Sequence, residues 1–169
     1  MRLLIVRHGI AVAPEKFVDA DRADESRPLT AKGRRRMRGA ARGLRRLVPE
    51  LDVLASSPLA RARETTEIVA AAYRRRETPV TIPALVSDAP LDDLRAWLDV
   101  QHPDATVALV GHEPHLSRVI GWLLTGTDRA LGELTRGGAC LLDCEAPVVP
   151  GTARLGWLLR AGQLRRLTR

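Results

Sequence analysis

Aromatic residues make up only 3% of this chain of 169 residues. Its hydrophobic content of 45% must therefore come mainly from Leu, Val, Ile and Ala, a composition that suits strands covered by helices. A single domain of this length is large enough to bury a sizeable core. We therefore predict one α/β domain over residues 1–169, rather than a disordered or fibrous chain.

Long apolar runs and cysteines are also scarce. No run approaches the roughly 20 residues that a transmembrane helix needs. The N-terminal apolar run is too short for a secretory signal, and no small-residue cleavage site follows it. The only cysteines, Cys140 and Cys144, would lie about 13 Å apart on one strand, too far for a disulfide. We expect no membrane span, a cytoplasmic location and two reduced thiols.

Lysine is nearly absent from a basic chain, since Lys16 and Lys32 are the only lysines although the net charge is +7. Such a charge attracts nucleic acid, anionic membranes and acidic substrates. The excess is arginine, which coding bias alone can produce, and neither a helix-turn-helix pattern nor an aromatic-rich RNA motif accompanies it. We expect the arginine clusters to be solvated helix faces or helix ends; they lie at 34–36, 45–46, 74–76 and 165–166.

Short apolar segments alternate with amphipathic ones along the chain. We predict strands at 3–6, 52–55, 80–82, 106–110, 139–144 and 153–159. Helices are predicted after the N-cap Thr30, after the N-cap Ser57, over 91–98, and from Glu113-Pro114 to about Leu124. This alternation indicates a three-layer α/β/α domain with a mostly parallel central sheet. The polar stretch from Ala11 to Arg27 is predicted to be a long loop that borders the active site.

Three predicted strands end in residues that suit phosphate chemistry. They are followed by Arg7-His8-Gly9, by Ser56-Ser57-Pro58-Leu59-Ala60-Arg61 and by Gly111-His112-Glu113-Pro114. Imidazole is a nucleophile near neutral pH, guanidinium holds phosphate oxygens with a planar fork, and glycine lets an anion approach the backbone. Because the carboxyl ends of parallel strands meet at one edge of a sheet, the three segments predict a phosphate site there.

Each of these residues also has a simpler interpretation. Arg61 could be one more solvated surface arginine, and His112 could be a buried core histidine. A pair such as His112 and His115 is also found in metal sites, but Pro114 disrupts their helical spacing and no cluster of carboxylates or thiols accompanies them. We therefore expect no metal and no other cofactor.

Taken together, the three segments resemble the signature blocks of the histidine phosphatase superfamily, also called phosphoglycerate mutase-like. The small size, the segment Arg27-Pro28-Leu29-Thr30-Ala31-Lys32-Gly33 and the short run from Arg61 to His112 resemble the SixA-type phosphohistidine phosphatases. Larger relatives insert a helical subdomain in that run, for which this chain has no room. The resemblance implies a minimal phosphoglycerate mutase-like fold without that insertion.

The resemblance also implies a metal-independent mechanism. His8 would be the nucleophile that forms a covalent phosphohistidine, which water then hydrolyses. Arg7, Arg61 and His112 would surround the phosphate oxygens, with His112 most useful as a cation. This agrees with the physics of phosphoryl transfer, which needs positioning and charge compensation more than covalent assistance.

The general acid departs from the larger family. Phosphoglycerate mutases carry a glutamate in the region matched here by Leu85-Val86-Ser87-Asp88, where this chain has serine. Asp88 is a possible replacement, and Asp92 and Glu113 are weaker candidates. The SixA-type proteins lack that glutamate too. A phosphoramidate releases imidazole, which needs less acid catalysis than an alkoxide, so the missing glutamate favours phosphohistidine as substrate.

The leading hypothesis is therefore a phosphohistidine phosphatase that acts on a phosphorylated protein in signal transduction, as a monomer. One alternative is a phosphatase of small phosphoesters or phosphoanhydrides on the same scaffold. Another is a basic module that binds nucleic acid or polyphosphate without catalysis; the intact His8, Arg61 and His112 argue against it.

Overall fold

The computed structural model describes residues 1–17, 24–75 and 77–168 and is organised around a six-stranded sheet in the order β3-β2-β4-β1-β5-β6. The strands are β1 (Arg2–Arg7), β2 (Val53–Ser56), β3 (Val80–Thr81), β4 (Thr106–Gly111), β5 (Ala139–Asp143) and β6 (Arg154–Leu159). The first four run parallel, and β5 is antiparallel to its neighbours β1 and β6. The predicted mostly parallel sheet is confirmed.

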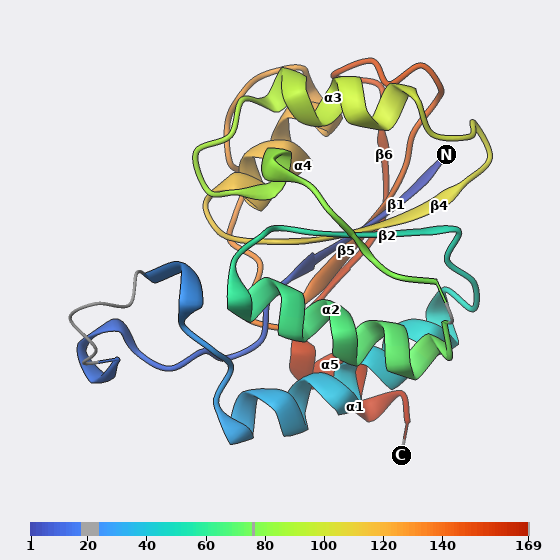
Figure 1. The fold of residues 1–169 in the computed structure, drawn as a ribbon. Helices are drawn as coiled ribbons and strands as arrows, with labels where there is room; N and C mark the ends of the chain where they lie inside the picture. The colour runs from blue at the N-terminus through green and yellow to red at the C-terminus, as the bar shows by residue number, and fades with distance from the viewer. Residues whose placement is uncertain (18–23, 76, 169) are drawn as a thin grey trace.

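Helices cover both faces of this sheet. They are α1 (Ala31–Leu47), α2 (Ala60–Tyr73), α3 (Leu91–Asp99), α4 (His115–Thr125) and α5 (Ala161–Arg166). Figure 1 shows α1, α2 and α5 on one face and α3 and α4 on the other, so the three-layer α/β/α architecture is confirmed. Among the helices of the described residues, none is long and apolar enough to cross a membrane.

The central strands are continuous apolar runs because each contributes to two cores. In β1, Leu3 and Ile5 join the core under α3 and α4, whereas the alternating Leu4 and Val6 join the core under α1, α2 and α5. All four side chains are fully buried. A strand whose two faces are both covered needs apolar residues at every position, which explains why the sequence signal was strong.

Two helix starts differ from the predictions. Thr30 caps α1 as predicted, its Oγ1 accepting a hydrogen bond of 2.9 Å from the Gly33 amide. However, α2 begins at Ala60 with Leu59 as N-cap, so the prediction of Ser57 as the cap is wrong. Likewise α4 begins at His115, after Pro114. The hydroxyl of Ser57 does not cap the helix; it contacts His112, which follows the neighbouring strand β4.

The C-terminal helix α5 was not predicted. It is only six residues long and Leu164 is its one buried residue, so it has no periodic apolar pattern that a sequence could reveal. The predicted thiol state is consistent with the structure, in which Cys140 and Cys144 are buried and free. Burial raises the pKa of Cys140 to about 12, which keeps this thiol protonated at neutral pH.

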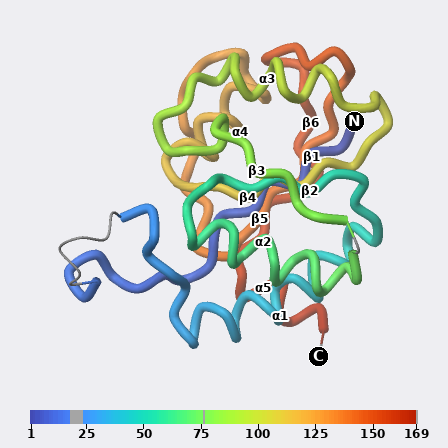
Figure 2. The backbone as a smooth tube through the Cα atoms, in the orientation of Figure 1, coloured from blue at the N-terminus to red at the C-terminus, as the bar shows by residue number. Residues whose placement is uncertain are grey.

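Between β1 and α1 the chain leaves the edge of the sheet and projects from the body of the molecule (Figure 2). The described part of the predicted loop contains short 3₁₀ turns at Pro14–Lys16 and Asp24–Ser26. Ala11 forms an isolated bridge with Leu29, which closes the base of the segment. Residues 18–23 of the predicted loop lie outside the described residues.

Candidate active site

The predicted site residues meet in one cleft at the carboxyl edge of the sheet. Its volume is about 430 Å³, and its walls include Arg7 and His8 at the end of β1, Arg61 in the first turn of α2, and His112 after β4. The projecting segment closes one side of the cleft, as predicted from the sequence; its residues there are Ala11, Ala13, Pro14, Glu15 and Arg27.

His8 is buried and held in one orientation. Its Nδ1 lies 2.7 Å from the carbonyl oxygen of Gly9. Because a carbonyl oxygen can only accept, Nδ1 carries the proton and the lone pair is on Nε2. Burial, followed by the charges of Arg61 and Arg7, lowers the pKa of His8 to about 4, against the opposing effect of the Gly9 carbonyl. At neutral pH His8 is therefore an uncharged imidazole with a free Nε2.

His112 lies beside His8 in the cleft and is oriented by a serine. Its Nε2 lies 2.8 Å from Ser57 Oγ, and Oγ itself accepts a hydrogen bond of 3.4 Å from the Leu59 amide. We assign the hydroxyl as the donor to Nε2, which places the His112 proton on Nδ1 and makes Nδ1 a donor.

The charge of His112 differs from the cation expected from the sequence. Burial, followed by the neighbouring His8 and Arg61, lowers the pKa of His112 to about 3. The ring is therefore neutral at pH 7 as the cleft stands. The sequence did not show that His112, 2% exposed, would share a desolvated edge with another histidine and with arginines.

The two arginines are anchored by one end of each guanidinium. Arg7 donates from Nη1 to the carbonyl of Leu134, and Arg61 donates from Nη1 to the Asp24 carbonyl at 3.0 Å. The same Arg61 nitrogen lies 3.1 Å from the carboxylate of Asp24. Burial lowers the pKa of both guanidinium groups, although an arginine keeps its charge at neutral pH.

Three buried polar atoms of the cleft have no hydrogen-bond partner among the described residues. They are Arg7 Nε, Arg61 Nε and His112 Nδ1. Each is a donor, and they come from three separate segments of the chain. Buried donors without partners are costly, so their gathering in one cleft calls for an explanation. A tetrahedral oxyanion in the cleft could accept hydrogen bonds from the side chains that carry them.

Sequence reasoning missed Thr65, which contacts the chain directly after His8. Its Oγ1 accepts a hydrogen bond of 3.0 Å from the Gly9 amide and donates one of 2.7 Å to the carbonyl of Arg61. The hydroxyl therefore ties the turn after His8 to the helix that carries Arg61. The spacing of α2 indicated only that Thr65 faces inward; a hydroxyl on an otherwise apolar helix face was the available signal.

Arg27 and Asp24 extend the charged wall of the cleft. The Asp24 carboxylate accepts a hydrogen bond of 2.8 Å from Arg27 Nε and also pairs with Arg61. Arg27 donates a second bond, of 2.7 Å, to the carbonyl of Val12. The projecting segment is thus fastened to α2 through one carboxylate between two arginines. Sequence reasoning used Arg27 only in the resemblance and gave Asp24 no role.

Glu113 and Arg136 also line the cleft. Glu113 is committed to structure, because its carboxylate accepts a hydrogen bond of 2.9 Å from the Leu134 amide and another from the Ser117 hydroxyl. Arg136 adds a positive charge near Arg7 and contributes to lowering its pKa. It lies in the loop before β5, far in sequence from the other cleft residues, and no sequence signal singled it out.

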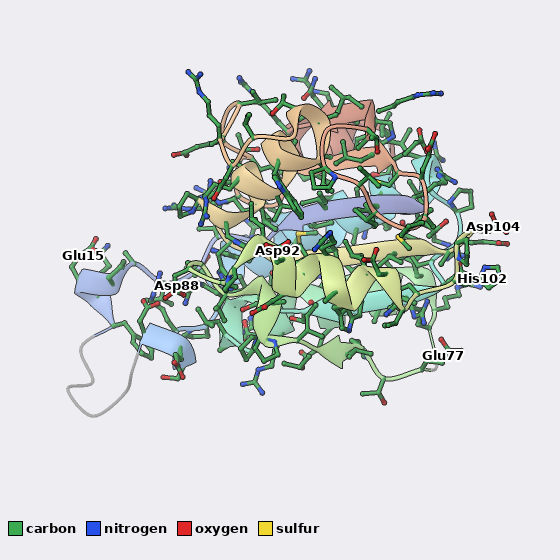
Figure 3. All side chains as sticks on the ribbon, turned by 90° about the horizontal axis from the view of Figure 1, so that it is seen from above. Glu15, Glu77, Asp88, Asp92, His102 and Asp104 are labelled. Carbon is green, nitrogen blue, oxygen red and sulfur yellow. The ribbon has the colours of Figure 1, made fainter. Side chains whose placement is uncertain are left out.

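The candidate general acid lies outside this set. Asp88 is exposed and is not among the residues that line the cleft, although its neighbour Ser87 is. Figure 3 shows Asp88 at the same end of the molecule as Glu15, whereas His102 lies at the opposite end. The assignment of Asp88 therefore stays a prediction. As for metals, the described residues contain no cluster of three His, Cys, Asp or Glu side chains suited to hold an ion.

Comparisons of sequence agree with the site. The sequence model of the histidine phosphatase superfamily (branch 1) matches residues 3–86, a span that includes Arg7, His8 and Arg61 but ends before His112. An uncharacterized protein of Picosynechococcus sp. is 40% identical over 122 residues, which cover 69% of this chain and 68% of that protein.

Solved structures share the fold over nearly the whole chain. The histidine phosphatase SixA complexed with tungstate superposes with a TM-score of 0.82 at 23% identity, covering 97% of this chain and 99% of that one. A SixA protein from Nakamurella multipartita, described as putative, gives 0.70 at 26% identity and 94% and 95% coverage. A mycobacterial glucosyl-3-phosphoglycerate phosphatase gives 0.69 at 18% identity and 92% and 96% coverage.

Proposed function

This chain belongs to the histidine phosphatase superfamily and is a hydrolase, and we propose that it removes phosphate from phosphohistidine in a phosphorylated protein. The observation that carries the proposal is that Arg7, Arg61 and His112 line the cleft that holds His8, and that each has a buried nitrogen without a hydrogen-bond partner among the described residues, namely Arg7 Nε, Arg61 Nε and His112 Nδ1. The donors suit the oxygens of a phosphoryl group, and His8 supplies a neutral nucleophile among them.

The reaction has two displacements at phosphorus. In the first, Nε2 of His8 attacks, a new P–N bond forms, and the bond to the leaving imidazole of the substrate breaks. In the second, water attacks phosphorus, the P–N bond to His8 breaks, and inorganic phosphate leaves. The arginines hold the equatorial oxygens in both steps, and the hydrogen bond from Nδ1 of His8 to Gly9 keeps Nε2 aimed at phosphorus.

The choice of phosphohistidine rests on the proton donors near the cleft. Glu113 lines the cleft, but both of its oxygens already accept hydrogen bonds. Asp88 is not among the lining residues. A leaving imidazole needs little protonation by the enzyme, whereas an alkoxide needs a well-placed acid. The two SixA structures compared above, one named a protein histidine phosphatase and the other a putative phosphohistidine phosphatase, support the same choice.

The test is a comparison of substrates with the purified protein. We expect a phosphohistidine protein to be dephosphorylated, and acid-labile phosphate to be trapped on the enzyme during turnover. His8→Ala should abolish both, with a fall in rate on the order of 10³-fold or more. A matched control is His102→Ala, since His102 is exposed and lies at the other end of the molecule.

A panel of phosphorylated small molecules decides the alternative. Turnover of a sugar phosphate far above that of phosphohistidine would assign the protein to small phosphoesters, as in the related glucosyl-3-phosphoglycerate phosphatase. Tight binding of nucleic acid with a steep salt dependence, and no phosphate trapped on His8, would instead favour the basic binding module. Retention of full activity in His8→Ala contradicts the covalent mechanism whichever substrate is used.

A further inference from the structure

A second cavity, of about 190 Å³, lies beside the catalytic cleft and shares Arg136 with it. Its other walls come from elements at the same edge of the sheet: the start of α1, the loop before β5 and the junction of β6 with α5. The chain also links the two spaces, because His8 lines the cleft and the next residue, Gly9, lines the second cavity. We call this space the arginine cavity.

The arginine cavity is lined by four arginines, namely Arg36, Arg136, Arg160 and Arg165. None of its lining residues is acidic, and none of the ion pairs between described residues involves any of the four. Like charges around a small cavity repel one another, and an anion between them reverses the sign of the interaction. The sequence predicts solvated positions for Arg36 and Arg165. Arg36 is exposed as predicted, and the fold also places both residues at the wall of this cavity.

Glycines on α1 bring Arg165 to the cavity. A Cβ on Gly43 would lie 2.0 Å from the carbonyl oxygen of Leu164, so α5 rests directly on the backbone of α1. A Cβ on Gly39 would lie 3.0 Å from Cγ of Arg165, so the stem of this arginine lies flat across the helix. The bare helix surface therefore positions the guanidinium that α5 supplies.

Glycines also expose backbone within the cavity itself. Gly9, Gly33, Gly137 and Gly162 all line it. Gly137 has a φ of +75°, and a Cβ there would lie 3.4 Å from both Ala161 Cβ and Met37 Sδ. The backbone conformation at this position therefore favours glycine, and lining positions that lack a side chain let a tetrahedral oxyanion come close to the backbone.

We infer that the arginine cavity is a second anion site, which receives another phosphate or carboxylate group of the molecule whose phosphoryl group enters the cleft at His8. The inference rests on the proposed function for the catalytic cleft and adds a preference for substrates with two anionic groups. Arg136 lines both spaces and can therefore contact such a substrate at either one.

The first test uses inorganic phosphate and NMR of the backbone amides. Phosphate should shift the amides of Gly33 and Gly162 in the arginine cavity as well as that of Ser87 in the cleft. Shifts confined to the cleft, at phosphate concentrations that saturate it, overturn the inference. This measurement needs no variant, and it reports on the arginine cavity even if the protein proves to have no phosphatase activity.

The second test removes two cavity charges while leaving the cleft intact. In the double variant Arg36→Gln/Arg165→Gln, the Gly33 and Gly162 shifts should weaken by about tenfold in apparent affinity, because each loss removes a charge-assisted hydrogen bond. The matched control is Arg35→Gln/Arg166→Gln, which removes the same charge from adjacent, exposed positions of the same helices. Equal behaviour of the two double variants overturns the inference.

Kinetics then identifies the source of the anionic group. One arm compares an alkyl bisphosphate with the corresponding monophosphate, and the other compares phosphohistidine peptides with and without a neighbouring acidic residue. For one of the two pairs, Arg36→Gln/Arg165→Gln should raise the KM of the doubly anionic substrate about tenfold, with kcat unchanged and with no effect on the singly anionic substrate of that pair. If the double variant keeps the KM of the unmodified protein for both doubly anionic substrates, the second site is contradicted. Loss of all activity in His8→Ala, by contrast, concerns only the catalytic cleft.

Discussion

The imidazole rings of His8 and His112 lie side by side in the cleft, with their centroids 5.0 Å apart and their planes tilted by 49°. Burial lowers the pKa of each ring, and the charge of Arg61 lowers both pKa values further. The two neutral rings lie in a cleft whose positive charge comes from arginines and attracts an anion. A bound anion should therefore change the pKa values of the two histidines.

Anion binding should raise the pKa of His112. Without a ligand, pKa values of about 4 for His8 and about 3 for His112 leave both rings neutral above pH 5. A tungstate or phosphate dianion favours the protonated form, so the pKa of His112 should rise by one unit or more, and protons should be taken up on binding. NMR titration of the ring carbons with and without tungstate measures the change. The ring signals of the exposed His102 are the control and should not respond to tungstate. An unchanged pKa of His112 contradicts its assigned contact with the anion.

Arg61→Lys should lower kcat/KM for phosphohistidine by about 10- to 100-fold. Lysine keeps the positive charge but lacks the planar fork that can bond to Asp24 and to a phosphate oxygen at once. Arg63→Lys on the same helix is exposed and should leave kcat/KM unchanged. Steady-state kinetics of both variants decides the point, and equal kinetics would remove Arg61 from the phosphate site.

Asp88→Asn tests the proton donor. If the sequence-based assignment is right, turnover of a phosphomonoester should fall by about 10²-fold, whereas turnover of phosphohistidine should change less than about threefold, because imidazole leaves without strong acid assistance. Asp93→Asn, an exposed position on α3, is the control, and parallel assays with the two substrate classes give the ratio. Equal losses for both substrates would mean that Asp88 contributes to structure rather than to proton transfer.

Gly33→Ala should destabilise the fold by about 1–3 kcal/mol, since a Cβ there would lie 2.0 Å from the carbonyl oxygen of Ile10. The first turn of α1 is held on the chain just after His8, because the amide of Thr30 also donates to that carbonyl at 2.9 Å. Urea denaturation measures the loss. Gly162→Ala, whose Cβ would be 3.9 Å from its nearest neighbour, should leave the free energy of unfolding within about 0.5 kcal/mol.

Much of the fold could be predicted from local patterns. The central strands can be recognised in the sequence because burial on both faces requires apolar residues throughout, as in β4. The start of α2 could not be predicted, because the hydroxyl of Ser57 contacts His112 at the end of the neighbouring strand β4 instead of capping its own helix. The short α5 was missed for a related reason, since it is held by close contact with the glycines of α1 rather than by an apolar stripe.

The sequence by itself determined that Arg7, His8, Arg61 and His112 gather at one edge of a sheet, because parallel strands end on the same side whatever else the chain does. Only the tertiary structure decided how these groups are protonated and which other residues join them. Burial keeps His112 neutral, and this burial depends on residues far away in the chain. Because β5 and β6 return to the same edge of the sheet, Arg136 reaches the cleft and the other arginines of the arginine cavity lie near it. Desolvation and long-range proximity are properties of the folded chain, and no local pattern encodes them.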